Sequence, residues 1–193
     1  MTTAAAVTPF SGAPLWYLTR STGLVSFALL TLAVALGVAA TRRAVAAPGW
    51  PRFATQALHR NLSLLALGFL VVHIATTVLD SFVSVSWQNA VLPFSSPYKR
   101  LGVGLGAIAF DLLLVVVVTS LLRLQLPHRL WRLVHLSVYA AWPLALLHFL
   151  RTGTDARSGQ LGSWLAVGSA ILVAGAVAVR VSTSSEAPRG VLR

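Results

Sequence analysis

Four histidines lie within apolar segments of the chain, and their spacing is the chemically most informative feature of the sequence. His59 and His73 are 14 residues apart in one segment, and His135 and His148 are 13 residues apart in another. Ionisable side chains inside hydrocarbon are costly and mark functional sites. Because imidazole is a common metal ligand, the pattern predicts two metal sites stacked across a membrane.

Helical geometry predicts which histidines meet. At 1.5 Å of rise per residue, His59 and His73 are about 21 Å apart along their helix, and His135 and His148 are about 20 Å apart. His59 therefore pairs with His135, and His73 pairs with His148. A single zinc or copper site would need ligands that converge at one point. A porphyrin between two helices needs one imidazole from each at the same height, so we predict haem iron.

The angular positions of the histidines around their helices fit this pairing well for His59 and His73 but poorly for His135 and His148. Fourteen residues leave about 40° between His59 and His73, so these two share a helix face. Thirteen residues leave about 140° between His135 and His148. Pro143 lies between them, and proline removes a backbone hydrogen bond and can kink a helix. We expect a kink there, or different approach angles of the two rings, to complete the second pair.

The composition indicates a membrane protein. The 193 residues are 56% hydrophobic, with a mean hydropathy of +0.79, well outside the range of soluble domains. The absence of cysteine excludes disulfides, iron–sulfur clusters and haem held by thiolate or thioether. The net charge of +11 comes from residues between apolar runs, which favours membrane orientation over nucleic-acid binding.

The apolar runs predict an all-α fold, a polytopic helical bundle with five transmembrane helices around two stacked haem sites. The expected helices cover approximately residues 15–40, 54–78, 101–122, 133–150 and 161–179. We divide the chain into an extracytoplasmic tail (1–14), a transmembrane domain (15–180) and a cytoplasmic basic tail (181–193).

Basic residues predict the orientation. Five spans place ten of them on one side, namely Arg42, Arg43, Arg52, Arg60, Arg123, Arg129, Arg132, Arg180, Arg189 and Arg193. The other side holds five, namely Arg20, Lys99, Arg100, Arg151 and Arg157. The richer side is expected in the cytoplasm, with the N-terminus outside a plasma or inner membrane. His59 and His135 then lie near the cytoplasmic face, His73 and His148 near the outer face, and His128 in a cytoplasmic loop.

The four histidines and several short sequence segments resemble the ferric reductase-like transmembrane domain. The segments are LHRN, DLLL, VTSLLR, WRLVH and AWPLALLH, at residues 58–61, 111–114, 118–123, 131–135 and 141–148. That superfamily includes NADPH oxidases, ferric reductases and the haem membrane subunit of a bacterial methionine sulfoxide reductase. The resemblance covers residues 16–179 and is strongest to short actinobacterial-type members.

The resemblance implies two haem b groups, each with two axial histidines. It also implies that Arg20 lies close to haem propionates, which offer an anion for bidentate pairing; snorkelling to the interface is the alternative. Arg60, Trp131 and Arg132 would lie near the cytoplasmic haem by position. The oxidases continue into a flavin and nicotinamide domain, whereas this sequence has no Gly-rich nucleotide fingerprint. We therefore expect a separate electron donor.

Supporting roles are expected of further polar residues. Asp111, well inside a span, could pair with Arg20, accept a hydrogen bond from a ligand histidine or accept a proton from a quinol. Each ligand ring should donate its second N–H to a carbonyl, hydroxyl or carboxylate. Candidates by spacing are Ser63, Thr76, Thr77, Ser137 and Tyr139. The loop at 81–100 is expected to cover the outer haem, and its Trp87, Gln88 and Tyr98 are expected to shape an acceptor site.

The expected function is that of an electron-transfer subunit in the membrane, with no catalytic residue assigned. Electrons would pass from a cytoplasmic flavoprotein or quinol to an outer acceptor such as ferric iron, oxygen, a quinone or a partner reductase. The alternative is a haem-free transporter subunit or scaffold whose histidines serve packing or proton handling.

Overall fold

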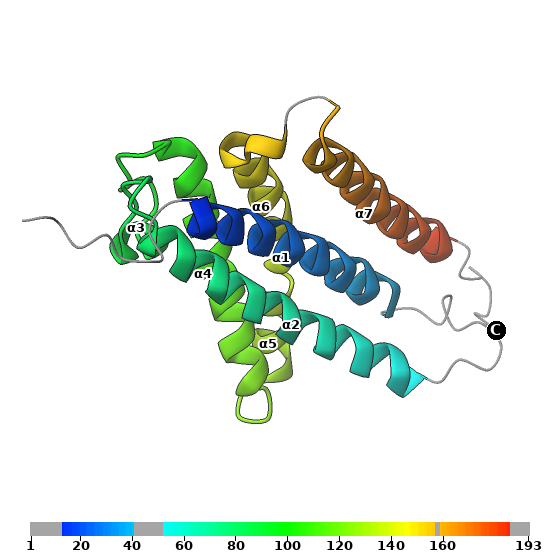
Figure 1. Cartoon of the computed structure of the whole chain (residues 1–193). Helices are drawn as coiled ribbons and strands as arrows, with labels where there is room; N and C mark the ends of the chain where they lie inside the picture. Colours follow the sequence, from blue (N-terminus) through cyan, green and yellow to red (C-terminus); the bar gives the residue numbers. More distant parts are fainter. Residues whose placement is uncertain (1–12, 41–51, 157–158, 186–193) are drawn as a thin grey trace, which may run out of the picture.

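A computed structural model describes residues 13–40, 52–156 and 159–185, which fold almost entirely into helices (Figure 1). The elements are α1 (Ala13–Ala40), α2 (Arg52–Leu79), α3 (Trp87–Val91), α4 (Arg100–Leu121), α5 (His128–His135), α6 (Val138–Thr152), the 3₁₀ turn η2 (Thr154–Ala156) and α7 (Leu161–Ser185). The described ranges contain no strand.

Five helical stretches are long and apolar enough to cross a membrane, so the predicted five-span, all-α fold is confirmed. They are Pro14–Val38, Phe53–Leu79, Arg100–Leu121, His128–Thr152 and Leu161–Ser182. Helices α5 and α6 together form the fourth of them. The chain is thus a multi-pass membrane protein. The predicted tails, 1–14 and 181–193, lie largely outside the described residues.

Helices α1 and α2 pack side by side over most of their length. Their register is visible in three hydrogen bonds that recur every seven residues. These bonds join α1 to α2 at three points: Thr19 to His73, Ser26 to Ala66, and Ala33 to His59. The residue numbers rise on α1 while they fall on α2. Seven residues are close to two helical turns, so all three contacts lie along one antiparallel seam.

A buried aromatic cluster joins α1 to α6. The ring of Phe27 stacks against those of Trp142 and Phe149, with centroids 6.3 and 5.4 Å away. The Trp142 indole donates a hydrogen bond of 3.0 Å to the Thr31 hydroxyl, which is itself buried. Side chains of α7, including Leu165 and Val173, pack against this cluster.

The fourth span is interrupted at Leu136–Ser137, and the expected kink at Pro143 is not where the helix breaks. Pro143 lies inside α6, which continues through it. At the break, the amides of Ser137, Tyr139 and Ala140 donate to carbonyls only three residues earlier. Such a 3₁₀ turn rotates the chain by about 120° per residue instead of about 100°. The tighter winding turns His135 towards the face that carries His148.

We expect Thr31→Val to destabilise the protein by about 1–3 kcal/mol, because it leaves the buried Trp142 indole N–H without an acceptor. Thermal unfolding in detergent measures the effect. Ser21→Ala is the matched control, since that exposed hydroxyl on the same helix bonds only the Leu18 carbonyl. Equal stability of the two variants would contradict a stabilising role for the α1–α6 hydrogen bond.

Candidate functional site: two facing histidine pairs

The structure brings the four histidines together in the pairs that their spacing predicts. The ring centroids of His59 and His135 are 6.4 Å apart, with ring planes at 67°. Those of His73 and His148 are also 6.4 Å apart, with planes at 81°. We call these the 59/135 pair and the 73/148 pair. Each joins a residue of α2 to a residue of the fourth span, so neither pair is local in sequence.

Backbone carbonyls fix the protonation of three of the rings. The Nδ1 atoms of His59, His73 and His148 lie 2.9, 2.9 and 2.8 Å from the carbonyl oxygens of Ala33, Thr19 and Gly102. A carbonyl can only accept a hydrogen bond, so each Nδ1 carries a proton, and in the neutral form of each ring Nε2 keeps its lone pair. The Nδ1 atom of His135 instead lies 3.5 Å from the Ser120 hydroxyl.

The hydroxyl groups proposed from spacing do not serve the rings, so that prediction is wrong. Ser63, Thr76 and Thr77 donate to carbonyls of their own helix. Tyr139 accepts a hydrogen bond from Arg180. The Ser137 hydroxyl is buried and has no hydrogen-bond partner among the described residues. Ser63, Thr76 and Thr77 do not serve the rings because their hydroxyls are already engaged with carbonyls of α2.

Glycines make room for the three carbonyl-bound rings. A Cβ added to Gly23 would lie 2.9 Å from the His73 ring, and one added to Gly106 would lie 2.5 Å from Nδ1 of His148. A Cβ on Gly37 would lie 3.2 Å from the His59 ring. These glycines were not identified from the sequence. A usable signal was present, because Gly23 and Gly37 are 14 residues apart, like the two histidines that they face.

The space between the paired rings is a cavity of about 1480 Å³, which all four histidines line. Pockets for small molecules are usually roughly 300–1,000 Å³, so this one is large. It lies where α2 faces the other histidine-bearing helices. Helix α2 packs closely on α1, and α4 packs on α6, whereas among the described residues α2 packs only weakly, if at all, on α4, α5 or α6. The rings therefore face each other across a gap wider than ordinary helix packing leaves.

The ring separation suits a metal ion held between two imidazoles. Imidazole nitrogens bind metal ions at about 2.0–2.1 Å, so two rings on opposite sides of one ion have centroids about 6 Å apart. The described part of the chain contains no group of three or more histidine, cysteine, aspartate or glutamate residues suited to a metal. Two imidazoles alone are too few for an ordinary protein metal site. A metal in either pair would have to bring its remaining ligands with it.

Other predicted site residues also reach the cavity. Arg60, Trp131 and Arg132 line it at the end of the 59/135 pair. The Trp131 ring stacks on that of His135, with centroids 5.0 Å apart and planes at 25°. Its indole N–H is buried and has no hydrogen-bond partner among the described residues. That donor could serve a ligand inside the cavity.

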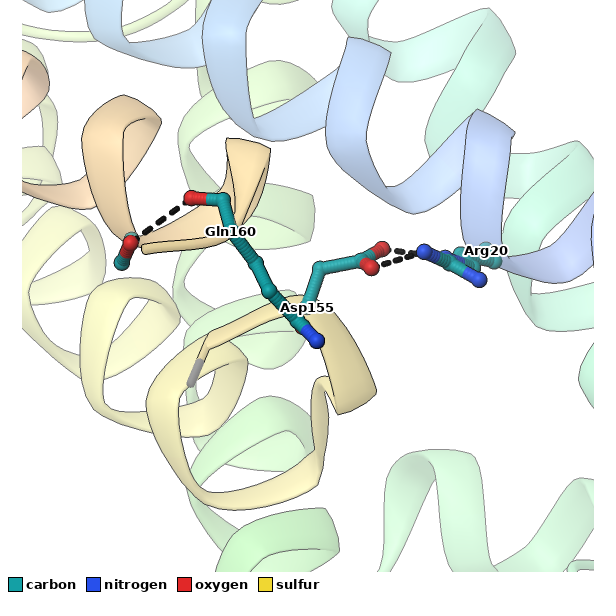
Figure 2. A network of polar contacts seen from close by, with 4 residues as sticks. Arg20, Asp155 and Gln160 are labelled. Carbon is teal, nitrogen blue, oxygen red and sulfur yellow. Dashed lines mark hydrogen bonds and ion pairs between the residues drawn. The ribbon is translucent and has the colours of Figure 1, made fainter. Parts of the chain in front are cut away.

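Arg20 lines the opposite end of the cavity and forms an ion pair with Asp155 (Figure 2). The guanidinium Nε and Nη2 atoms each donate to a different carboxylate oxygen, which is the bidentate geometry that arginine favours. Asp155 is buried in η2. The carboxylate that Arg20 needs is thus supplied from the connection between α6 and α7, 135 residues away.

Asp111 takes neither of the two structural roles considered for it at this site, and the proton-accepting role stays a prediction. It is not the partner of Arg20, and it is not among the residues that line the cavity. Nor does it bond a histidine ring nitrogen in the described structure. Its side chain is half-buried on the α4 face that also carries Leu114, Val115 and Val118, so the helical rotation of α4 turns it away from the pairs.

The loop between α2 and α4 lies at the end of the cavity near the 73/148 pair. Of the three loop side chains expected there, only Tyr98 lines the cavity. Tyr98 and Asn89 line the cavity. Trp87 and Gln88 are exposed and do not line it. The short α3 turns these two side chains outwards while its buried Asn89 accepts hydrogen bonds from Ser86.

We expect Gly106→Ala to destabilise the protein by about 1–3 kcal/mol, because its methyl group would overlap the His148 ring. Thermal unfolding in detergent measures the loss. Gly168→Ala is the matched control, since nothing lies within 4 Å of a Cβ added there. If both substitutions had the same effect, the close approach of α4 to His148 would not matter for stability.

We expect Arg20→Met to cost about 2–3 kcal/mol, because it leaves the buried Asp155 carboxylate without its cation. A double-mutant cycle with Asp155→Leu measures the coupling. The double variant should be more stable than the sum of the single losses predicts. Simple additivity would contradict a stabilising ion pair.

The comparisons place the chain in a family. No curated protein and no solved structure matches it. A family described as a domain of unknown function matches residues 14–155, a segment that contains all four histidines, Arg20 and Asp155. Because the match covers well over half of the sequence, the chain belongs to the DUF8596 family.

Proposed function

We propose that each histidine pair holds one haem b and that the chain carries electrons across the membrane from one haem to the other. The observation that carries this proposal is the 6.4 Å separation of the rings in both pairs. The proposal includes membership of the ferric reductase-like group of membrane cytochromes, for which the histidine spacing is the main support.

The residues present fit this cofactor. A porphyrin supplies four nitrogen ligands to its iron, so the two imidazoles of each pair would complete six-fold coordination. The porphyrin nitrogens would therefore supply the ligands that the protein does not, since no third candidate ligand lies at either pair among the described residues. The cavity of about 1480 Å³ reaches both pairs. When bound, haem would supply one-electron oxidation and reduction, and the two histidines of each pair would be its protein ligands.

Named side chains would hold the cofactor in place. Nε2 of each histidine would be the ligand atom, because Nδ1 is taken by a carbonyl or a hydroxyl. Arg60, Arg132 and the indole N–H of Trp131, which has no partner among the described residues, would meet the carboxylates of the haem in the 59/135 pair. Arg20 is the corresponding cation at the 73/148 pair, where Asp155 already engages two of its nitrogens.

The route of the electrons follows from the predicted orientation. The excess of basic residues would place the 59/135 pair near the cytoplasm. Electrons would enter there from a separate flavoprotein or from quinol. They would leave from the 73/148 pair, near the outer face of a plasma or inner membrane, to ferric iron, oxygen, a quinone or a partner reductase. Along α2 the two ligand positions are about 21 Å apart.

We expect the protein purified from haem-replete cells to show a reduced-minus-oxidised spectrum of b-type haem, with two haems per chain. His135→Ala and His148→Ala should each remove one haem, because each takes an axial ligand from a different iron. The double variant should remove both. The measurement is haem content per chain by pyridine haemochrome, with helix content checked by circular dichroism.

His128→Ala is the control, since His128 contacts the Trp131 ring but belongs to neither pair. It should retain both haems. A stable, colourless protein from haem-replete cells would overturn the proposal and would favour the haem-free transporter or scaffold. Loss of haem in the His128 variant with retention in His148→Ala would contradict the assignment of ligands.

A further inference from the structure

The four histidines are not supported equally, and the difference lies in one residue of α4. His59, His73 and His148 donate to backbone carbonyls at 2.8–2.9 Å. His135 meets the Ser120 hydroxyl at 3.5 Å, at the outer limit for a hydrogen bond. The 73/148 pair therefore has two carbonyl-supported rings, whereas the 59/135 pair has one.

The three carbonyl contacts share a pattern. In each, the residue four positions after the accepting carbonyl is a glycine, namely Gly23 after Thr19, Gly37 after Ala33 and Gly106 after Gly102. A helical carbonyl points towards the amide of the fourth residue on. A ring that reaches the carbonyl must pass over that residue, so a side chain there would stand in its way.

Ser120 occupies the fourth such position. Gly23 and Gly37 are 14 residues apart on α1, and Gly106 and Ser120 are 14 residues apart on α4. By the same rule, the carbonyl four residues before Ser120 is that of Val116. The Ser120 side chain fills the place of the missing glycine, and its hydroxyl meets His135 instead of that carbonyl.

The kind of acceptor changes the imidazole as a ligand. When the imidazole N–H donates a hydrogen bond to a strong acceptor, the ring gains electron density. The opposite ring nitrogen then becomes a better electron donor to a metal. A better donor favours ferric over ferrous iron and lowers the reduction potential. A contact of 3.5 Å to a hydroxyl increases the donor strength of the ring less than a hydrogen bond of 2.8 Å to a carbonyl does. Two arginines that line the cavity at this end, Arg60 and Arg132, act in the same direction, because positive charge favours the reduced form.

We propose that Ser120 is a positioning residue that makes His135 the weakest electron donor of the four ligands, so that the haem of the 59/135 pair has the higher reduction potential and holds the first electron. The proposal rests on the proposed haem function. It assigns the 59/135 pair as the electron store of the two and makes the 73/148 pair the stronger reductant.

Ser120→Gly tests this by completing the pattern of the other three sites. Removal of the side chain should let His135 reach the Val116 carbonyl and should lower the potential of one haem. Ser120→Ala removes the hydroxyl but keeps a Cβ in the way, so its potential should not fall. Potentiometric titration of the full-length protein in the His148→Ala background, which retains only the haem of the 59/135 pair, measures the shift directly.

In the parent protein, the 59/135 haem should be reduced first, with a preference of at least about tenfold, or ~59 mV for one electron. The His135→Ala background gives the potential of the other haem for comparison. The proposal fails if the 73/148 haem has the higher potential. It fails equally if Ser120→Gly and Ser120→Ala shift the potential in the same direction.

A second readout separates this result from failure of the haem proposal. Nitrogen-15 NMR of labelled histidine in haem-free protein reports the protonation of each ring without any cofactor. Among the four rings of the two pairs, three should show Nδ1–H bonded to a carbonyl, and Ser120→Gly should convert that of His135 to the same signature. A colourless parent protein with this NMR pattern would overturn the haem assignment alone. Four equivalent rings in the parent protein would overturn the role of Ser120 alone.

Discussion

The hydrogen bond from imidazole Nδ1 to a helix carbonyl is the interaction on which the arrangement of the site depends. A polar ring inside a membrane span has no water to satisfy it, so a partner must come from the protein. Here the partner is the backbone of the next helix, α1 for the two histidines of α2 and α4 for His148. The same bond fixes the tautomer and the direction of Nε2.

This requirement divides the molecule into two halves. One is the closely packed pair of α1 and α2, and the other is the pair of α4 and α6 with α5. In the first half, α2 carries two histidines and α1 provides their carbonyls. In the second half, α5 and α6 each carry one of the paired histidines, and α4 provides one carbonyl and one hydroxyl. The halves face each other across the cavity and are joined at its side by the cluster of Phe27, Trp142 and Phe149. Tight packing within the halves therefore coexists with open space between them.

The two ends of the cavity differ in charge. At the 73/148 end, the cation of Arg20 is matched by the buried carboxylate of Asp155, which ties α1 to the connection before α7. At the 59/135 end, Arg60, Arg123 and Arg132 line the cavity, and none of the described residues that line it there is acidic. An anionic group would be stabilised more strongly at that end, because the described lining there supplies positive charge and no acidic side chain.

Much of this architecture could be derived from the sequence. Apolar runs of about 20 residues determine five spans, since a bilayer of fixed thickness requires that length. The 14-residue spacing of His59 and His73 determines that both share one helix face. The sequence also contained, unrecognised, the matching interval between Gly23 and Gly37. These features are periodic and local, so the regular geometry of a helix is enough to interpret them.

Only the tertiary structure decided the contacts between distant segments. The fourth span breaks at Leu136–Ser137, where the backbone hydrogen bonds shorten to a three-residue spacing, and α6 continues through Pro143. Arg20 pairs with Asp155 and not with the mid-span Asp111, because the fold turns Asp111 away from the cavity. The acceptor of each histidine ring lies on another helix. Its identity depends on helix register and rotation, which spacing along one helix does not contain.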